Sequence, residues 1–434
     1  MSNWLAVMRS RAPGISLAAL AAGLFLGVPS AAVAQERGSK LEAEKEQPPK
    51  LEPIGARIGA FRAFVNVDVN AVYDDNVYAQ DTAKRDDVYA KISPSVRLVA
   101  DNSQYKAKLT AGIDRYEYSK LDAESRTDWN VGSEVVAELL RDTSVTLNAG
   151  FRRATEERGA PDSPVSARSP VRYESFTAGG GLSREVGRLQ LRTLVDYEKL
   201  NFDDGRLGSG GVINNDDRDR QYVSGGAEIS YEFSPGYRIY GRGLVDRVAY
   251  RIPFDDTGFN RDGKGYRLTG GVKFDITNVI AGSVFAGYMR RNYKDPRFAD
   301  YGGIAYGASI VWNPTRLTSV YFDANRGIQE TTQVGYRGFI STNAGVRVEH
   351  DLTRFIQLRA GLRYDKNKYL LTSAPLPLPI ARDDDLVFAN IGLNYLLSRQ
   401  VSFGASYEYG KRSSNAPAAD YTRNKAIGYV KLTF

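Results

Sequence analysis

The sequence contains no cysteine and only one histidine among its 434 residues. Without cysteine the chain can form neither a disulfide framework nor a thiolate metal site, and it has no thiol nucleophile. A single histidine also excludes metal centres built from several imidazoles. The mean hydropathy is −0.38, which is too low for a helical membrane bundle with several long apolar runs.

The chain also has only a small excess of one sign of charge over the other. The 58 basic residues exceed the 51 acidic ones by only seven, spread over the whole chain, so no nucleic-acid partner is expected. Short acidic clusters such as Asp74-Asp75 and Asp383-Asp384-Asp385 lack the spacing of an EF-hand or a glycine-rich calcium repeat. They are interpreted as solvated loop charge, and no metal site or cofactor is expected.

The long apolar run at the N-terminus has the pattern of an export signal. Arg9 and Arg11 precede the run from Ile15 to Val28, and small residues end in Ala32-Val33-Ala34. A basic region, an apolar region and an A-x-A site predict a secretory signal peptide over residues 1–34, with an uncleaved membrane anchor as the alternative. Residues 35–56 are polar and proline-containing, which predicts a flexible periplasmic lead-in.

From residue 57 to residue 434 the dominant period is two, which is the period of a β-strand. In the segment 61–73, apolar residues from Phe61 to Tyr73 fall on one face, while Arg62, Asn66 and Asp68 fall on the other. The same alternation recurs in segments 105–114 and 266–276 and continues to the last residue. Many side chains on the apolar faces are small, since alanine and glycine are mixed with valine, leucine and isoleucine.

The connections between these segments alternate in length. Eight short turns are expected, at Asp101–Gln104, Arg141–Thr143, Glu185–Arg188, Ser234–Gly236, Thr277–Asn278, Asn313–Arg316, Asp351–Arg354 and Ser398–Arg399. Nine longer polar loops lie between them, and the loops 154–172 and 199–219 are long enough to fold inward as a constriction. Short periplasmic turns and long extracellular loops are typical of outer-membrane barrels.

Residues 57–434 therefore predict an all-β fold, a transmembrane antiparallel up-and-down β-barrel of about 18 strands, with 16 as the alternative count. Lipid offers no hydrogen-bond partner to the backbone, so an exported chain without apolar helices spans a membrane as a closed sheet. Tyrosine and tryptophan at the strand ends, including Tyr73, Trp129 and Trp312, suit the two interfacial girdles. The alternative is a soluble β protein with these aromatics in its core.

The last seven residues alternate and end in phenylalanine, with Val430, Leu432 and Phe434 on one face. This pattern is similar to the signal that the outer-membrane barrel insertion machinery reads. We therefore expect that machinery as a partner, together with outer-membrane lipid and lipopolysaccharide. The expected location is the outer membrane of a Gram-negative cell after signal-peptide-dependent export.

Three short motifs carry a family resemblance: Tyr73-Asp74-Asp75-Asn76-Val77-Tyr78, the segment Tyr288–Pro296, and the turn Trp312-Asn313-Pro314-Thr315. Together they resemble the putative beta-barrel porin 2 family, over about residues 57–434. The resemblance implies a barrel associated with exopolysaccharide synthesis and export. It also implies periplasmic and inner-membrane export proteins as partners. It supplies no catalytic residues.

The polar face of each strand would line an aqueous lumen. The candidate translocation residues are charged residues of this face. Two neighbouring strands contribute Arg337, Arg347, Arg359 and Arg363, with Asp128, Glu134 and Glu138 roughly opposite them, and two further strands contribute Arg238, Arg242, Arg267 and Lys273. A basic wall facing an acidic wall would orient polar or anionic solutes. Alternatively, these charges simply pair across strands. Inward Tyr240 and Tyr321 are candidates for stacking on sugar rings.

An enzyme is not expected. A serine or aspartate site would need a histidine base, and the single histidine, His350, directly precedes a predicted periplasmic turn. Strand acids are too numerous to single out the carboxylate pair of a glycosidase. Three functions therefore remain open, namely a polysaccharide-export porin, a general or anion-leaning diffusion porin, and a structural or adhesive barrel without transport.

Overall fold

The computed structural model describes residues 53–163, 167–277, 279–372 and 381–434. The expected signal peptide and most of the expected lead-in lie outside these residues. The described chain is almost entirely β-structure, and no helix within it is long and apolar enough to cross a bilayer.

Long strands follow one another along the chain, and each pairs antiparallel with its neighbours. The main sheet has 19 strands, of which all but the short β1 form the barrel wall, giving 18 strands as predicted. The strands are β1 (Ala56–Ile58), β2 (Phe61–Asp74), β3 (Asp87–Asp101), β4 (Tyr105–Tyr118), β5 (Arg126–Leu140), β6 (Thr143–Thr155), β7 (Arg172–Val186), β8 (Leu189–Phe202), β11 (Arg220–Ser234), β12 (Tyr237–Tyr250), β13 (Gly263–Ile276), β14 (Ile280–Tyr293), β15 (Tyr301–Thr315), β16 (Thr318–Gln329), β17 (Tyr336–Asp351), β18 (Ile356–Leu371), β19 (Asp383–Leu396), β20 (Val401–Ser414) and β21 (Tyr421–Thr433).

The loops contain four short elements. The 3-10 turn η3 (Asp122–Glu124) lies between β4 and β5. The loop between β8 and β11 contains the small hairpin β9 (Gly205–Arg206) and β10 (Val212–Ile213), followed by η4 (Asp216–Arg218).

The barrel closes between its first and last long strands. β2 pairs antiparallel with β21, from Asn66 opposite Thr433 to Asp74 opposite Lys425. The terminal residue extends this ladder, because the backbone N–H of Phe434 donates to the carbonyl of Val65 (2.8 Å) and the carbonyl of Phe434 accepts from the N–H of Val65 (3.1 Å). Closure leaves no free sheet edge in the membrane, where an unpaired backbone group would have no partner.

The alternation along each strand separates an outer face from a lumen face. On β2, Val65, Val69 and Tyr73 are each at least 40% exposed, whereas Asn66 and Asp74 are buried on the opposite face. The interfacial aromatics Trp129, Tyr231 and Trp312 are likewise exposed on the outer face. These apolar outer faces meet lipid, which is why they are exposed in the isolated chain.

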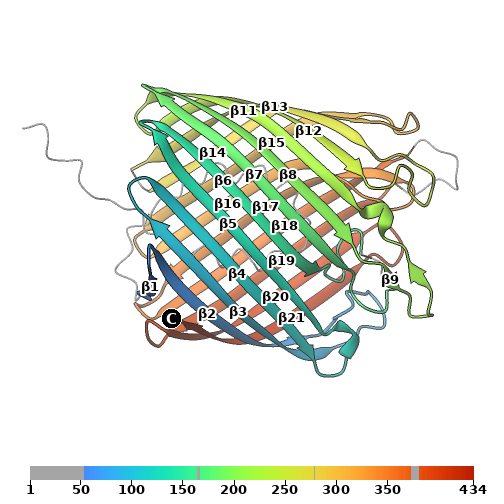
Figure 1. Ribbon diagram of the computed structural model, residues 1–434. Helices are drawn as coiled ribbons and strands as arrows, with labels where there is room; N and C mark the ends of the chain where they lie inside the picture. The colour runs from blue at the N-terminus through green and yellow to red at the C-terminus, as the bar shows by residue number, and fades with distance from the viewer. Residues whose placement is uncertain (1–52, 164–166, 278, 373–380) are drawn as a thin grey trace, which may run out of the picture.

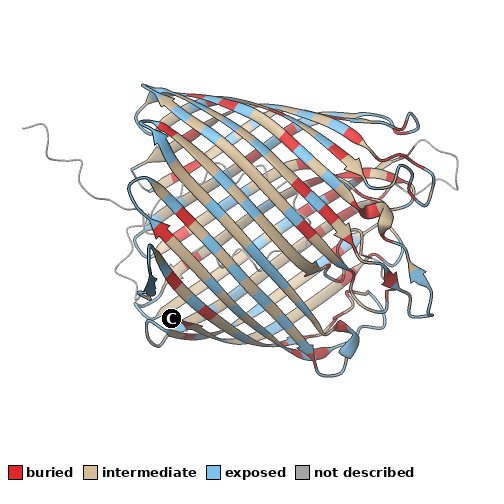
Figure 2. Ribbon diagram, in the orientation of Figure 1, coloured by how far each residue is buried: buried red, intermediate tan, exposed pale blue. Residues whose placement is uncertain are grey.

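The two ends of the barrel differ, as the sequence predicted (Figure 1). One end has connections of two to four residues and holds the C-terminus, which identifies it as the periplasmic end. One predicted turn is shorter than expected, because β15 continues through a bulge to Thr315 and turns at residues 316–317. The opposite, extracellular end holds the long loops, and buried residues gather toward it (Figure 2).

Candidate functional site

The wall of the lumen contains the charged residues that the sequence singled out. Arg238, Arg267 and Arg363 alternate with exposed lipid-facing neighbours such as Ile239, Leu268 and Leu362, so their side chains belong to the inner face. The same register places the other strand candidates inward: Arg242, Lys273, Arg347, Arg359, Asp128, Glu134 and Glu138.

Two ion-pair groups occupy the periplasmic half of β11 to β13. Glu228 of β11 accepts from both Arg242 (Nε to Oε2, 2.8 Å) and Lys273, and both Glu228 and Lys273 are nearly inaccessible. Arg238 bonds Glu232 of β11 (Nε to Oε2, 3.1 Å) and Glu185 of β7. These cations are therefore neutralised by carboxylates of neighbouring strands.

The cations on β17 and β18 differ in their partners. Arg363 bonds Asp365 (Nε to Oδ1, 2.8 Å), and Arg347 lies 3.8 Å from the nearest oxygen of Glu349. Arg359 donates to the side-chain amide of Gln357 (2.8 Å), and no carboxylate of the described residues lies within ion-pair distance of it. Arg337 sits beside a bulge in β17, where it donates to the backbone carbonyl of Leu371.

The acidic candidates on β5 make fewer polar contacts than the basic ones. Asp128 accepts a hydrogen bond from Thr155 (2.7 Å) and lies 4.0 Å from Arg126. Glu134 and Glu138 are exposed to the lumen, and within the described part of the chain neither forms an ion pair. A continuous basic wall is therefore absent from β12, β13 and β18 in the described residues, because acids interleave with the cations there.

The two tyrosines proposed to stack on sugar rings are both inward and both lie beside cations. The Lys273 ammonium is 4.9 Å from the ring centre of Tyr240, and the Arg347 guanidinium is 4.2 Å from that of Tyr321. Tyr240 is also buried. Tyr321 is the more accessible of the two rings, although one side of it meets Arg347.

The outer mouth is spanned by the loop between β6 and β7, one of the two loops that the sequence showed to be long enough to fold inward. Its residue Arg158 forms a buried ion pair with Glu124 of η3, with Nη2 2.6 Å from Oε1. Arg158 also donates to the carbonyl of Ala167 (2.8 Å). The carbonyl of Gly159 accepts from Arg412 of β20 at 3.0 Å.

The same loop reaches the far side of the barrel. Asp162 accepts a hydrogen bond from Thr331 (2.5 Å), and the carbonyl of Pro161 accepts one from Gln333. Both partners belong to the loop between β16 and β17, which is separated from β6 and β7 by six strands in one direction and eight in the other. The segment 156–163 therefore crosses the mouth.

A further contact fixes the start of this segment. Glu156 pairs with Arg218 of η4 (Oε1 to Nη2, 2.6 Å), and both side chains are 6% exposed. The cavity beneath, lined among others by Asp162, Glu198 and Tyr222, measures about 30 Å³. That space accommodates water but not a sugar ring.

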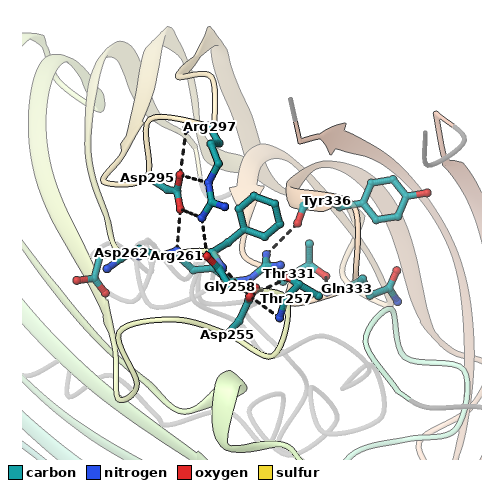
Figure 3. Close-up of polar contacts among 12 residues, drawn as sticks. Asp255, Thr257, Gly258, Arg261, Asp262, Asp295, Arg297, Thr331, Gln333 and Tyr336 are labelled. Carbon is teal, nitrogen blue, oxygen red and sulfur yellow. Dashed lines mark hydrogen bonds and ion pairs between the residues drawn. The ribbon is translucent and has the colours of Figure 1, made fainter. Parts of the chain in front are cut away.

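Three outer loops are joined beside this segment by a group of arginine contacts, which we call the loop clasp (Figure 3). In the loop between β12 and β13, Arg261 bonds Asp255 (Nε to Oδ2, 2.5 Å). The same guanidinium donates to the backbone carbonyls of Thr331 (2.6 Å) and Tyr336 (2.8 Å). Asp295, from the loop between β14 and β15, accepts from the backbone N–H of Asn260 at 2.9 Å.

The pKa values of the loop carboxylates are shifted in opposite directions by their surroundings. The side chain of Arg297 holds the pKa of Asp295 well below its ordinary value. Burial alone would raise the pKa of Asp255, but the Phe259 backbone N–H and the Arg261 guanidinium outweigh burial and lower it. In contrast, burial and then the nearby Asp256 raise the pKa of Asp217, within η4, to about 6.

The sequence did not identify these loop residues. Arg158, Glu124, Arg218 and Arg261 lie in polar loops without strand periodicity, and nothing in the local pattern distinguishes them from solvated charge. The polar partners of their side chains lie between 6 and 75 residues away along the chain, and Arg261 shows both extremes, with Asp255 and Tyr336. Only the lengths of the loops signalled that something could fold inward.

The structure gives the single histidine a structural contact. His350 is the penultimate residue of β17, at the periplasmic end, and its Nδ1 lies 2.9 Å from the hydroxyl of Thr318 on the paired strand. In the described residues, no group of three His, Cys, Asp or Glu side chains is arranged to hold a metal ion.

A closed antiparallel barrel with a polar lumen, a lipid-facing apolar surface and long extracellular loops defines an outer-membrane protein of the porin and transporter class. The chain matches the family described as "Putative beta-barrel porin 2" over residues 48–434, and it belongs to that family. This description is that of a porin and not of an enzyme. No curated protein matches the sequence.

Solved structures with a similar fold are outer-membrane receptors and channels. The copper transporter OprC has a TM-score of 0.47 at 11% identity, with 88% of this chain and 82% of that chain covered. The siderophore receptor PirA from Acinetobacter baumannii has a TM-score of 0.45 at 8% identity, covering 86% and 80%. OccK2 from Pseudomonas aeruginosa, solved in complex with glucuronate, has a TM-score of 0.44 at 10% identity, covering 86% and 98%.

Proposed function

We propose that this barrel is an outer-membrane channel for the export of an extracellular polysaccharide, and that the loops spanning its outer mouth hold it closed at rest. The observation that carries the closed state is the segment 156–163, which is bonded to loops on opposite sides of the barrel. Such a segment lies directly in the path of a polymer leaving the cell, so export requires it to move.

The lumen chemistry supports a long, weakly charged polar cargo. Conduction requires sites that bind well enough to admit a substrate and weakly enough to release it. The ion pairs around Glu228 and Arg238 remove most of the local net charge while leaving many donors and acceptors on the wall. A hydroxyl-rich chain can exchange hydrogen bonds with such a wall without being trapped by an isolated charge.

The proposal also follows the resemblance that the sequence motifs carry, which implies exopolysaccharide export with periplasmic and inner-membrane partners. We expect the periplasmic end of the barrel, with its short turns, to face those partners. We propose no enzymatic role, since the single histidine contacts a threonine at the end of a strand.

A deletion strain tests the export function. We expect it to lose surface polysaccharide while taking up small solutes at the wild-type rate, and the intact gene should restore the polysaccharide. Normal polysaccharide in the deletion strain, together with slower uptake of small solutes, would instead support a diffusion porin.

The second candidate function is an anion-leaning diffusion channel, and Arg359 favours it. This arginine faces the lumen with an amide as its hydrogen-bond partner, so its charge is less compensated than that of Arg363. Single-channel recording distinguishes the candidates, because a diffusion porin conducts small ions steadily, whereas the export channel proposed here stays mainly closed. A structural or adhesive barrel would show no conductance in any state.

A further inference from the structure

Two cations face each other on the outer surface of the barrel, near the extracellular ends of β12 and β13. Arg247 and Lys264 are register partners on these strands, and both are exposed. They lie on the lipid-facing side, because Arg247 shares its face with Val245 (64% exposed) and Lys264 shares its face with Leu268 (57% exposed).

The neighbouring outer surface is graded from charged to apolar. Tyr266, one pleat below Lys264, is the register partner of Arg290 on β14. Tyr288 and Ile304 continue the apolar surface toward the membrane centre. The two cations therefore stand just above the aromatic girdle, at the level of the outer-leaflet headgroups.

Several other outward-facing cations near this level have acidic partners. Arg115 pairs with Glu117, Arg290 with Asp300 at 3.1 Å, and Lys366 with Asp385 at 3.5 Å. Among the residues that the structure describes, Arg247 and Lys264 form no ion pair. Like charges directly opposite each other on paired strands are destabilising, so this pair needs a compensating anion.

We propose that Arg247 and Lys264 bind a phosphate group of the lipid A moiety of lipopolysaccharide, with Arg290 at the edge of the site. A lipid phosphate supplies the missing negative charge, and its acyl chains lie along the apolar surface below. Guanidinium and ammonium groups are the usual phosphate ligands of proteins. The site is independent of what the lumen transports.

Native mass spectrometry of the detergent-purified full barrel tests the proposal, with bisphosphorylated lipid A as the probe. We expect the double variant Arg247→Gln/Lys264→Gln to bind lipid A roughly tenfold more weakly than the wild type. The matched control is Arg115→Gln/Lys366→Gln, which removes two outward cations that have carboxylate partners, and it should bind as the wild type does. A charge-preserving exchange, Arg247→Lys/Lys264→Arg, should also retain binding.

Three results would overturn the proposal. The first is wild-type affinity in the double variant while that variant is folded. The second is equal affinity of the wild type for lipid A and for its dephosphorylated form, which would assign binding to the acyl chains. The third is displacement of lipid A by inorganic phosphate at equal concentration, which would identify a site for the free ion.

Discussion

Arg158 and Glu124 form a buried ion pair that ties the segment crossing the mouth to the loop between β4 and β5. Their side chains are 4% and 1% exposed, and the guanidinium also lies 5.1 Å from the ring centre of Tyr78 in a third loop. Removing this guanidinium from water is costly, and its bonds to a carboxylate and a carbonyl offset that cost. We therefore expect the closed state to depend on this contact.

We predict that Arg158→Gln opens the channel. The change leaves Glu124 buried without its counter-ion, a situation that costs about 3–5 kcal/mol in other proteins. The strand ladder does not include these residues, so the loop should yield while the barrel stays folded. Single-channel recording should show longer and larger openings than in the wild type.

The control is Arg153→Gln at the base of the same loop. Arg153 pairs with Asp203 at 3.1 Å, but both side chains are about 40% exposed, so their pairing contributes little to stability. We expect the control to conduct as the wild type does. Equal conductance of Arg158→Gln and the wild type would show that the segment 156–163 does not hold the mouth closed.

A second prediction concerns pH. Burial and Asp256 raise the pKa of Asp217 to about 6 from an ordinary value of 3.8, so the folded loop binds this proton more tightly than the unfolded loop. Asp217 therefore stabilises the folded loop most below pH 3.8, and its contribution is lost as the pH rises toward 6. We expect faster amide hydrogen exchange around η4 at about pH 7 than at about pH 4.5, after correction for the intrinsic rate.

The variant Asp217→Asn isolates this effect. An amide cannot ionise beside Asp256, so the variant should keep the low-pH exchange behaviour throughout the range. If the variant retains the pH dependence of the wild type, another group controls the loop. Asp255 and Asp295 do not interfere in this range, because their lowered pKa values place their titration in more acidic solution.

The fold was predictable because each strand carries its own evidence. Alternation in segments such as 61–73 marks a face for lipid and a face for the lumen, and alternating turn lengths distinguish the two ends. The same alternation predicts that Arg363 and Lys273 lie on the lumen side of the wall, so the sequence alone indicates which residues face the lumen.

The mouth could not be predicted in this way. The contact between Asp162 and Thr331 joins residues 169 positions apart, and it depends on loops whose conformation no periodicity governs. The partners of the lumen charges were equally hidden. Arg363 and Arg359 both face the lumen from one strand, yet among the described residues only Arg363 has a carboxylate in contact. Such differences arise from rotamers and local register.

A third prediction concerns ion selectivity. The double variant Arg359→Glu/Arg363→Glu replaces two inward cations with anions, so reconstituted open channels should shift toward cation preference. Reversal potentials in a salt gradient measure the shift. The single variants separate the contributions, because Arg359→Gln removes a charge without a carboxylate contact, whereas Arg363→Gln also leaves Asp365 without its partner. Unchanged reversal potentials in all variants would place the selectivity-determining region elsewhere.

The last prediction concerns assembly and rests on the seam of the barrel. Phe434 exchanges two backbone hydrogen bonds with Val65, and its side chain is 53% exposed on the outer rim together with Val430. We expect deletion of Phe434 to reduce strongly the amount of folded barrel in the outer membrane, because both the final backbone pairing and the proposed recognition signal are lost.

Phe434→Ala keeps the backbone bonds and removes only the ring. Folded barrel is measured as the band whose gel mobility changes on boiling. A large loss in both variants would assign the effect to the ring, a loss in the deletion alone would assign it to the backbone pairing, and wild-type amounts in both would contradict the prediction.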